Sequence, residues 1–445
     1  MGISATFFLL AATFGSQEKS YVIGSTVLCA VYLLLLYING LAGKAKKYIK
    51  IILLFLIVCE LSVSSFIAIK TNQLTNRDEY PDSYEKIQAV LMSRQPVRHD
   101  FYRTEIDEIF TINDPYLYNY QGISFFSSTA NKYVTNFMQG FGLPSNGGGN
   151  NYFYNEATPL TNAFLNIRYM ITFDDFPADK GMYWNYVDQT GDTLLMENRY
   201  YLPLGFMVNE DISGYTHGSA NPFLSKNDLF RRATGLAGNL FTITDLSNNT
   251  LAPASQRQNL ATWSYTMPSD GMLYVYCKDE KNDTISVYLN GASLTTVETP
   301  PNIYYIAVLG YFSQYDVISF MADKDAIIYT GLLDFDLFEQ GYAILASSPL
   351  NLTHFSNTKA SGNVTALRDG VLYTSIPGKN WNVYVNGSKS ELLLIDNAMA
   401  AVRLSEGTHN VEFWYFNRSF AAGIIISLVS VAVFLAMIIR QKTRN

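Results

Sequence analysis

One acidic residue lies in the middle of an otherwise apolar segment. Residues 51–69 carry a single formal charge, on Glu60. A bare carboxylate at the centre of a bilayer costs about 2.5–3.5 kcal/mol, so Glu60 should face other helices or a wet cavity. We predict one of three roles for it: a lipid-phosphate or cation site, a proton relay, or a packing hydrogen bond to a helix outside this chain.

A second candidate is Arg103, near the start of the polar middle of the chain. A guanidinium can clamp the phosphate of a donor or acceptor through two parallel hydrogen bonds. A surface or core salt bridge is the alternative. Glu60 and Arg103 are therefore the candidate substrate-binding residues, and the catalytic residue stays unassigned.

Patterns of nucleophilic catalysis and of metal binding are missing from the sequence. There is no Gly-x-Ser-x-Gly elbow and no recognisable Ser/His/Asp or Cys/His set. The four histidines are scattered, and the acidic run Asp279–Asp283 lacks the organisation of a calcium loop. We predict no metal site and identify no bound cofactor from the residues themselves.

Aromatic residues offer a further kind of chemistry. The chain has 32 Tyr and 28 Phe, and its polar middle is also rich in Asn. Aromatic faces stack on the apolar faces of sugar rings, and amides satisfy sugar hydroxyls, so this composition suits glycan contact. Packing within sheets is the alternative, because Tyr and Phe are favoured strand residues.

Composition limits the class of protein. A chain of 445 residues is long enough for two or three domains, and a net charge of −7 argues against nucleic acid as a partner. Of the three cysteines, only Cys277 lies outside the apolar runs, which excludes a disulfide framework in the polar middle. Apolar residues concentrate at the two ends of the chain.

Three apolar segments are long enough to span a membrane as helices. They are residues 21–38, 51–69 and 420–439. Residues 3–14 are apolar but shorter, and we interpret them as the tail of a helix that begins outside this chain. The lipid bilayer is therefore a predicted partner.

Basic residues set the predicted orientation. Two Lys/Arg clusters flank the apolar segments, and such clusters favour the cytoplasmic side. Residues 70–419 contain no further candidate span, so the charge rule places them outside a bacterial plasma membrane. The clusters are Lys44, Lys46, Lys47 and Lys50, and Arg440, Lys442 and Arg444.

The polar middle begins with helical patterns and continues with strands. Residues 83–93 read as a short amphipathic helix with Ser83 as a plausible cap. From Phe101 onward, β-branched and aromatic residues alternate with turn formers. A second helix is predicted at 219–235, with Pro222 in its first turn and Gly235 at its end.

The last third contains a weak internal repeat about a hundred residues apart. Each copy has an Asp-Gly strand start, a strand that ends in the hairpin signal Asn-Gly, and an alternating closing strand. We interpret the two copies as consecutive antiparallel sandwiches. The segments are Asp270–Tyr274, Val287–Gly291 and Asp316–Phe320, then Asp369–Tyr373, Val383–Gly387 and His409–Tyr415.

The predicted fold class is therefore an α+β membrane protein. Transmembrane helices at both ends flank a mostly β extracytoplasmic region that ends in two sandwich-like units. The predicted domains are 1–69 (helices), 70–212 (α/β), 213–250 (helical connector), 251–345 (first sandwich), 346–418 (second sandwich) and 420–439 (final helix).

Several segments, in this order, resemble the YfhO family of bacterial polytopic membrane proteins. The resemblance covers essentially the whole chain, yet only the C-terminal half of the family's architecture. The matching segments are Phe101–Glu105, Tyr120–Ser128, Thr158–Leu160, Leu165–Tyr169, Glu197–Val208, Asn221–Phe223 with the helix to Gly235, and Gly378–Trp381 through Glu406–His409.

The resemblance implies a GT-C-like glycosyltransferase. Such enzymes take sugars from a lipid-linked, polyprenyl-phosphate donor, and this family is associated with modifying teichoic-acid-type polymers of the cell envelope. Their catalytic carboxylate lies in the first large external loop, which we expect upstream of Met1. We therefore predict the C-terminal, acceptor-handling part of such an enzyme, which needs the N-terminal helices as partners. The alternative is a non-catalytic, membrane-anchored carbohydrate-binding or adhesion protein.

Overall fold

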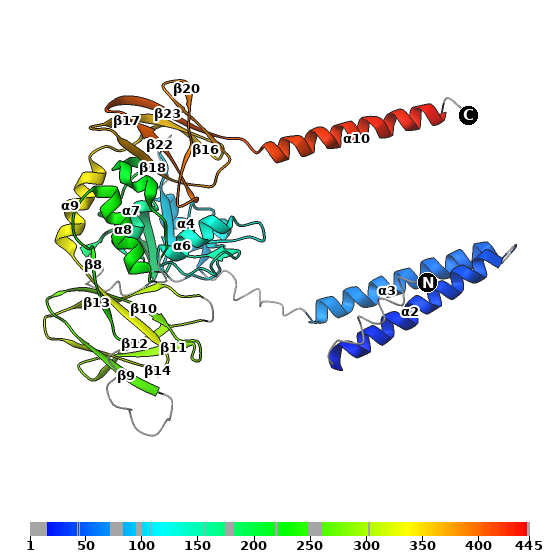
Figure 1. The fold of residues 1–445 in the computed structure, drawn as a ribbon. Coiled ribbons are helices and arrows are strands. Elements are labelled where there is room, and N and C mark those ends of the chain that lie inside the picture. Colours follow the sequence, from blue (N-terminus) through cyan, green and yellow to red (C-terminus); the bar gives the residue numbers. More distant parts are fainter. Residues whose placement is uncertain are drawn as a thin grey trace. The chain divides into compact units, whose positions relative to one another are not determined.

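A computed structural model of the chain shows an α+β fold, mostly strands in open sheets, with apolar helices near both ends (Figure 1). It divides into two compact units, Met1–Asp82 and Ser83–Asn445. The structure describes residues 16–41, 43, 45–71, 83–94, 100–107, 109–155, 157–173, 182–218, 221–247, 260–300 and 303–442.

In its described part, the first unit consists of two helices. They are α2 (Ser16–Leu41) and α3 (Lys46–Thr71), which pack against each other. The predicted segment 21–38 lies within α2, and the stretch Thr26–Leu41 of this helix is apolar. The predicted partial helix at 3–14 and the basic residue Lys44 lie outside the described residues.

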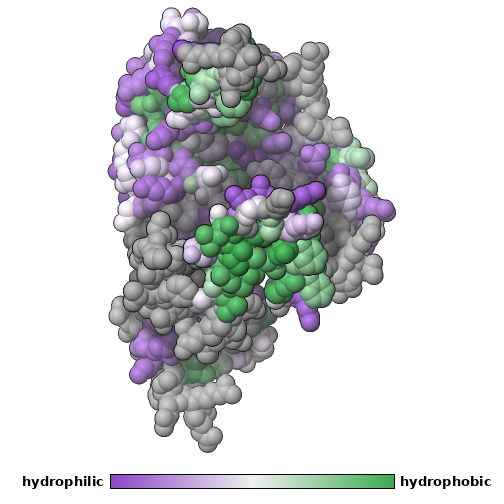
Figure 2. Space-filling model, turned by 90° about the vertical axis from the view of Figure 1, so that its right-hand side faces the viewer, coloured by the Kyte–Doolittle hydropathy of each residue, from purple (hydrophilic) through white to green (hydrophobic). Residues whose placement is uncertain are grey.

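Two helices in the described part of the chain are long and apolar enough to cross a membrane. They are α3 and the stretch Arg418–Arg440 of α10 (Arg418–Lys442), which contain the predicted segments 51–69 and 420–439. None of the residues in their apolar windows is buried. Figure 2 shows a patch of hydrophobic residues, in green, on the face that it presents. Exposed apolar surfaces of this kind mark sites of contact with a membrane or with another protein.

The second unit begins with α4 (Tyr84–Met92), close to the predicted helix. Ile87 and Val90 are fully buried on the face that the sequence pattern indicates, against the first sheet. Ser83 makes no side-chain capping bond, so the predicted cap is wrong. That sheet is formed, in spatial order, by β1 (Arg103–Ile106), β4 (Ile167–Phe173), β6 (Thr193–Asn198) and β5 (Trp184–Thr190).

Short helices and a two-stranded ribbon surround the largest hydrophobic core. At its centre Phe164, Phe206 and Tyr373 are fully buried, with ring centroids 5.1–5.3 Å apart. The surrounding elements are α5 (Asp114–Leu117), β2 (Phe125–Phe126), α6 (Lys132–Gly140), β3 (Asn151–Tyr152), α7 (Pro159–Phe164), η3 (Glu210–Gly214), α8 (Pro222–Thr234) and α9 (Phe335–Ala346).

Helix α8 follows the predicted boundaries in part. Asn221, rather than a residue near 219, caps its start by accepting a hydrogen bond from the backbone N–H of Phe223 at 2.9 Å. Pro222 occupies the first turn, where its missing N–H costs nothing. Gly235 ends the helix at φ +76°, a conformation that glycine adopts at little cost.

Eight strands between β8 and β15 form two four-stranded sheets around one core. Trp263 lies in that core with none of its surface exposed. The first sheet is β13 (Ile306–Phe312), β10 (Gly271–Lys278), β15 (Ile327–Leu333) and β8 (Phe241–Asp245). The second is β12 (Ala292–Glu298), β11 (Thr284–Leu289), β14 (Val317–Asp323) and β9 (Leu260–Thr266).

The C-terminal strands form another pair of sheets around a separate core. Val383 and Phe413 are fully buried there. One sheet is β16 (Asn351–Ser356), β17 (Lys359–Ala366), β23 (Gly407–Tyr415), β19 (Trp381–Val385) and β20 (Ser388–Ser390). The other is β21 (Leu393–Ile395), β22 (Met399–Leu404), β18 (Gly370–Pro377) and β7 (Gly205–Val208).

The internal repeat is visible in the strand pairing. Both Asn-Gly pairs form the turn of a hairpin: Asn290 and Gly291 have φ of +50° and +86°, and Asn386 and Gly387 have +52° and +80°. These are the angles of a type I′ turn. In equivalent places, β10 pairs with β13 and β18 with β22, while β11 pairs with β14 and β19 with β23.

Strand pairing crosses two of the predicted domain boundaries. In the first copy of the repeat, β15 follows β14 in the chain and pairs with β10. In the second copy no strand follows β23 before α10 begins, and β7, from much earlier in the chain, pairs with β18 in the equivalent place. The residues of β7 lie in the predicted α/β region 70–212. β8 lies in the range 213–250, which was predicted as a helical connector, and pairs with β15. Helix α9, at the end of the range 251–345, was not predicted.

Candidate functional site

The cavity that contains a predicted site residue lies beside strand β1. It has a volume of about 470 Å³ and is lined by Arg103, by the segment from Pro115 to Phe125, by the start of α6 and by the end of β18. We call it the Arg103 cavity. Its wall therefore includes much of the segment Tyr120–Ser128 that the sequence singled out.

The guanidinium of Arg103 is fixed along one edge. Its Nη1 donates to the carbonyl oxygen of Leu165 at 2.8 Å and to Oγ of Ser375 at 2.7 Å. Its Nη2 donates to the carbonyl oxygen of Ser375 at 3.0 Å. The Nε–H and the second Nη2–H have no hydrogen-bond acceptor among the described residues.

These contacts correct one of the two predictions for Arg103. The structure shows no salt bridge to this side chain within the described residues; backbone carbonyls and a hydroxyl hold it instead. Burial lowers the pKa of Arg103, but a guanidinium still keeps its charge at neutral pH. Arg103 can therefore present a positive charge and two donors to a ligand in the cavity.

Glu105 lies two residues along the same strand and was missed by the sequence reasoning. Its side chain is fully buried. Oε1 accepts hydrogen bonds from the backbone N–H groups of Ile123 and Ser124, and Oε2 accepts one from Oγ of Ser124 at 3.0 Å. Burial raises the pKa of Glu105 to about 7, although these hydrogen bonds and the Arg103 charge lower it. The i, i+2 spacing was the available signal, because it places both side chains on one face of a strand.

Polar and aromatic side chains complete the wall. The hydroxyl of Tyr120 is buried without a hydrogen-bond partner among the described residues. Tyr116 is 69% exposed at the rim, and Phe125 lies beside it with ring centroids 6.4 Å apart. At Gly122 a Cβ atom would approach Glu105 Oε1 to 2.9 Å, so only glycine lets this loop pass over the carboxyl group. A buried hydroxyl without a partner costs free energy that a ligand can recover.

Glu60, the other predicted site residue, lies in the first unit. The hydroxyl of Tyr32 in α2 donates to Glu60 Oε2 in α3 at 2.7 Å. The structure thus shows a hydrogen bond between two helices, as one of the three predicted roles requires, but its partner belongs to this chain. Glu60 and Arg103 belong to different units and form no common site within either one.

The comparisons with known proteins bear on the whole chain. A family model described as "Bacterial membrane protein YfhO" matches residues 1–427. The chain belongs to the YfhO family. This confirms the predicted resemblance and supports a membrane localisation, and no curated protein matches the chain.

Solved structures similar to this YfhO-family chain include three glycoside hydrolases, all remote from it. A GH2 β-galacturonidase from Eisenbergiella tayi is 10% identical (TM-score 0.18), with 40% of this chain and 37% of that chain covered. A family 2 glycosyl hydrolase from Bacteroides cellulosilyticus is 10% identical (0.14; 36% and 23%). A β-glucuronidase from Ruminococcus gnavus is 10% identical (0.17; 41% and 41%). The matched region spans less than half of each, and TM-scores this low carry no argument.

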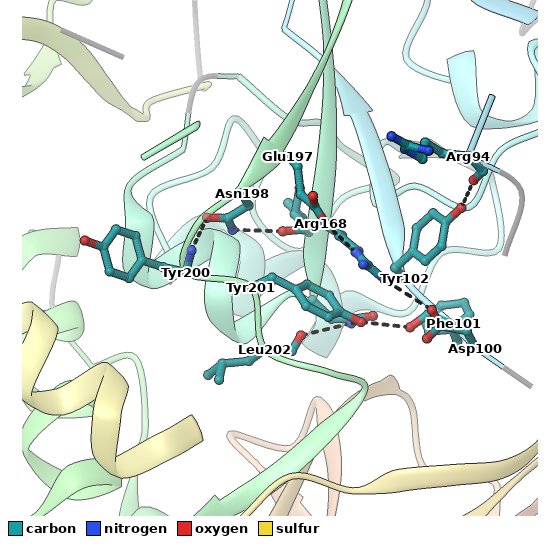
Figure 3. Close-up of polar contacts among 12 residues, drawn as sticks. Arg94, Asp100, Phe101, Tyr102, Arg168, Glu197, Asn198, Tyr200, Tyr201 and Leu202 are labelled. Carbon is teal, nitrogen blue, oxygen red and sulfur yellow. Dashed lines mark hydrogen bonds and ion pairs between the residues drawn. The ribbon is translucent and has the colours of Figure 1, made fainter. Parts of the chain in front are cut away.

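Three of the segments that carried the YfhO resemblance meet around the start of β1 (Figure 3). Arg168 is paired with Glu197 at 2.9 Å and with Asp100 at 3.2 Å. The hydroxyl of Tyr201 donates to the carbonyl oxygen of Phe101 at 3.2 Å. Asp100 and Phe101 lie just before β1, so these contacts fix the start of the strand that carries Arg103 and Glu105.

The acidic run at 279–283 has a structural role. Asp279 accepts hydrogen bonds from the backbone N–H groups of Lys281 at 2.9 Å and of Asp323 at 3.0 Å, which fixes a turn between strands. Lys281 is paired with Asp323 at 2.9 Å. Within the part of the chain that the structure describes, no group of three or more metal-binding side chains occurs.

Proposed function

We propose that this YfhO-family chain is the C-terminal, acceptor-binding part of a polytopic membrane glycosyltransferase. In this proposal the enzyme takes a sugar from a polyprenyl-phosphate donor and transfers it to a teichoic-acid-type polymer of the cell envelope. Residues 70–419 lie outside the plasma membrane, and the two pairs of sheets act as sandwich-like units that frame the acceptor. The first large external loop of such an enzyme, upstream of the acceptor-binding part, supplies the catalytic residue.

The observation that carries this proposal is the donor set in the Arg103 cavity. Two N–H groups of Arg103 and the hydroxyl of Tyr120 have no partner among the described residues, and all three belong to side chains of one cavity wall. Two parallel N–H donors match two oxygens of a phosphate. Teichoic-acid-type polymers carry a phosphodiester in every repeat, so each repeat offers this cavity a matching group.

The rest of the cavity suits the polyol or sugar that flanks each phosphodiester. Tyr116 and Phe125 offer ring faces, and the side chains of Asn119 and Gln121 are exposed amides at the same wall. Ligand sites commonly combine aromatic walls with a few placed polar groups in this way. The buried Glu105 beneath the wall is neutral below about pH 7 and then leaves the charge of Arg103 uncompensated.

Binding of a glycerol-phosphate oligomer by the purified chain in detergent micelles tests the proposal. Tyr120→Phe removes one oxygen without disturbing a protein hydrogen bond, and a hydrogen bond to a charged group contributes about 1.5–3 kcal/mol. We expect calorimetry to show a dissociation constant at least 10-fold larger for Tyr120→Phe.

Tyr215→Phe is the matched control for this experiment. Its hydroxyl is also buried without a partner among the described residues, but Tyr215 does not line the Arg103 cavity. We expect this variant to bind as the unchanged chain does. Equal affinities of all three proteins, or equal losses in both variants, would contradict the assignment of the cavity.

A non-catalytic carbohydrate-binding or adhesion protein is the competing function. One observation favours it: among the described residues, no carboxylate lines the cavity, and Glu105 beneath its wall is fully buried. A sugar-transfer assay distinguishes the two functions. It uses a labelled polyprenyl-phosphate donor and the longest native gene product that contains this chain. Binding without any transfer would favour the competing function.

A further inference from the structure

A second cavity lies at the C-terminal end of helix α6. It has a volume of about 250 Å³, and we call it the His217 cavity. Strands β10 and β15 supply one wall, Gln139 and Gly140 at the end of α6 supply another, and His217 lies between them. Gly140 permits this approach, because a Cβ atom there would lie 2.4 Å from Cβ of His217.

Three tyrosines form the aromatic part of this cavity. The rings of Tyr276 and Tyr329 are stacked, with centroids 6.4 Å apart and planes inclined by 26°. Lys278 Nζ lies 5.2 Å from the ring centroid of Tyr304. Burial raises the pKa of Tyr276 to about 12, so its hydroxyl remains a neutral donor. Aromatic faces next to hydroxyl groups suit a ligand with one apolar face and a polar edge.

His217 is held in position by Asp396. Its Nδ1 contacts Oδ2 of Asp396, and its backbone N–H donates to Oδ1 of Asp396 at 3.4 Å. Asp396 occupies a tight turn between β21 and β22 with φ +53°. The hydrogen bond between the His217 ring and the Asp396 carboxylate raises the pKa of His217. The other ring nitrogen, Nε2, has no hydrogen-bond partner within the described ranges.

The charges around the cavity are balanced in pairs. His217 faces Asp396, and Lys278 is paired with Glu280 at 2.9 Å. An anionic ligand would therefore have to displace an existing partner, whereas an uncharged ligand disturbs neither pair. A volume of 250 Å³ also lies below the roughly 300–1,000 Å³ of sites for drug-sized ligands. The cavity fits one ring, not an oligomer.

We propose that the His217 cavity is a subsite for a single uncharged sugar ring. The apolar face of the ring stacks on Tyr276 and Tyr329, and its hydroxyls bond to His217 Nε2 and the amide of Gln139. This inference rests on the proposed function, since it takes the ligand to be one unit of the bound glycan. It differs from the Arg103 cavity, which binds the phosphodiester.

One element links the two sites. Helix α6 contributes Val134 and Met138 to the Arg103 cavity, and Gln139 and Gly140 to the His217 cavity. Met138 and Gln139 are consecutive, so both cavities adjoin this helix within its length of about 13 Å at 1.5 Å per residue. A polymer with a sugar substituent a few units from a phosphodiester can therefore reach both sites.

The test is binding of a neutral hexose trisaccharide to the full chain in detergent micelles, followed by saturation-transfer NMR and calorimetry. Aromatic contacts of this kind correspond to about 2- to 12-fold in affinity. We expect losses of this size in Tyr329→Leu and in Tyr304→Leu. Tyr311→Leu, on the neighbouring strand β13 and outside the cavity, should bind as the unchanged chain does.

The Tyr120→Phe variant separates this inference from the proposed function. It should leave trisaccharide binding unchanged while it weakens the glycerol-phosphate oligomer. Trisaccharide binding lost in Tyr120→Phe but kept in both leucine variants would place the sugar in the Arg103 cavity and overturn the inference alone. Absence of trisaccharide binding by the folded chain at roughly 10 mM ligand, about ten times a dissociation constant of 1 mM, would also overturn it. Trisaccharide binding without oligomer binding would instead refute the proposed function.

Discussion

Replacing Glu105 by glutamine should make the protein more stable at neutral pH and leave its stability unchanged in acid. Burial raises the pKa of Glu105 from 4.5 to about 7. The folded state therefore binds more protons than the unfolded state between these values, and stability falls as pH rises through this window. One pKa unit corresponds to about 1.36 kcal/mol, so the charged side chain costs roughly 3 kcal/mol above pH 7.

Glutamine is a close substitute at this position. Its amide oxygen can accept the hydrogen bonds from Ile123 and Ser124, and its amide nitrogen can donate to Oγ of Ser124. The substitution therefore removes the titrating charge and keeps the packing. A gain of about 3 kcal/mol corresponds to roughly 6–12 °C in Tm for a cooperative unit of 150–250 residues.

Thermal unfolding of the full chain in detergent, from pH 4.5 to pH 8.5, measures this effect. The difference in Tm between Glu105→Gln and the unchanged chain should grow with pH and level off above about pH 7. Glu298→Gln, the same substitution at an exposed position of β12, serves as the control and should change Tm little at any pH. A difference of equal size at pH 4.5 and pH 8 would show that burial of the charge is not its source.

Three further predictions concern stability and topology. Burial lowers the pKa of Lys226, so Lys226→Met should stabilise the fold by on the order of 1–4 kcal/mol at pH 7. The gain in Tm should shrink as pH rises towards 10, and an unchanged Tm at pH 7 would contradict this prediction. Trp263→Ala should cost about 3–5 kcal/mol because the side chain is fully buried, and denaturant unfolding should show a smaller loss for the partly exposed Trp381→Ala. In intact cells, an impermeant thiol reagent should label a cysteine at position 389 but not one at position 47, both exposed sites; the reverse pattern would refute the proposed orientation.

Features that depend on a few neighbouring residues were predictable from the sequence. The Asn-Gly turns at Asn290 and Asn386 were found because the type I′ turn requires positive φ at both central positions, and these residues tolerate it. The end of α8 at Gly235 follows the same reasoning. The cap of α4 failed because hydrogen bonding by Ser83 depends on its own φ and ψ, which the composition does not determine.

Features that depend on distant partners were not predictable. β7 has only four residues, and all of them are buried. Its sequence therefore lacks the alternation of apolar and polar residues that predicts a strand, and nothing in it indicates which sheet it joins. Its place beside β18 follows from the absence of a further strand between β23 and α10. Helix α9 was missed because its apolar and aromatic residues also suit a strand.

The candidate site was predicted in part for the same reason. Arg103 was identified by its charge and position, but its free donor edge became visible only with the contacts to Leu165 and Ser375. Glu105 was missed because a lone glutamate in a strand pattern gives no sign of burial. The amide and hydroxyl groups of the cavity come from a loop, a helix and a strand that only the tertiary fold brings together.

The position of Ser375 has a consequence for how the Arg103 cavity forms. Ser375 lies 272 residues after Arg103, on β18, and supplies two of the three hydrogen bonds that fix the guanidinium. β18 in turn pairs with β7, which precedes it by more than 160 residues in the chain. The Arg103 cavity therefore exists only when the C-terminal pair of sheets has folded around β7. In the proposed function, acceptor binding therefore depends on the fold of the C-terminal strands through this one serine, since a guanidinium released from Ser375 would lose the orientation of its free edge.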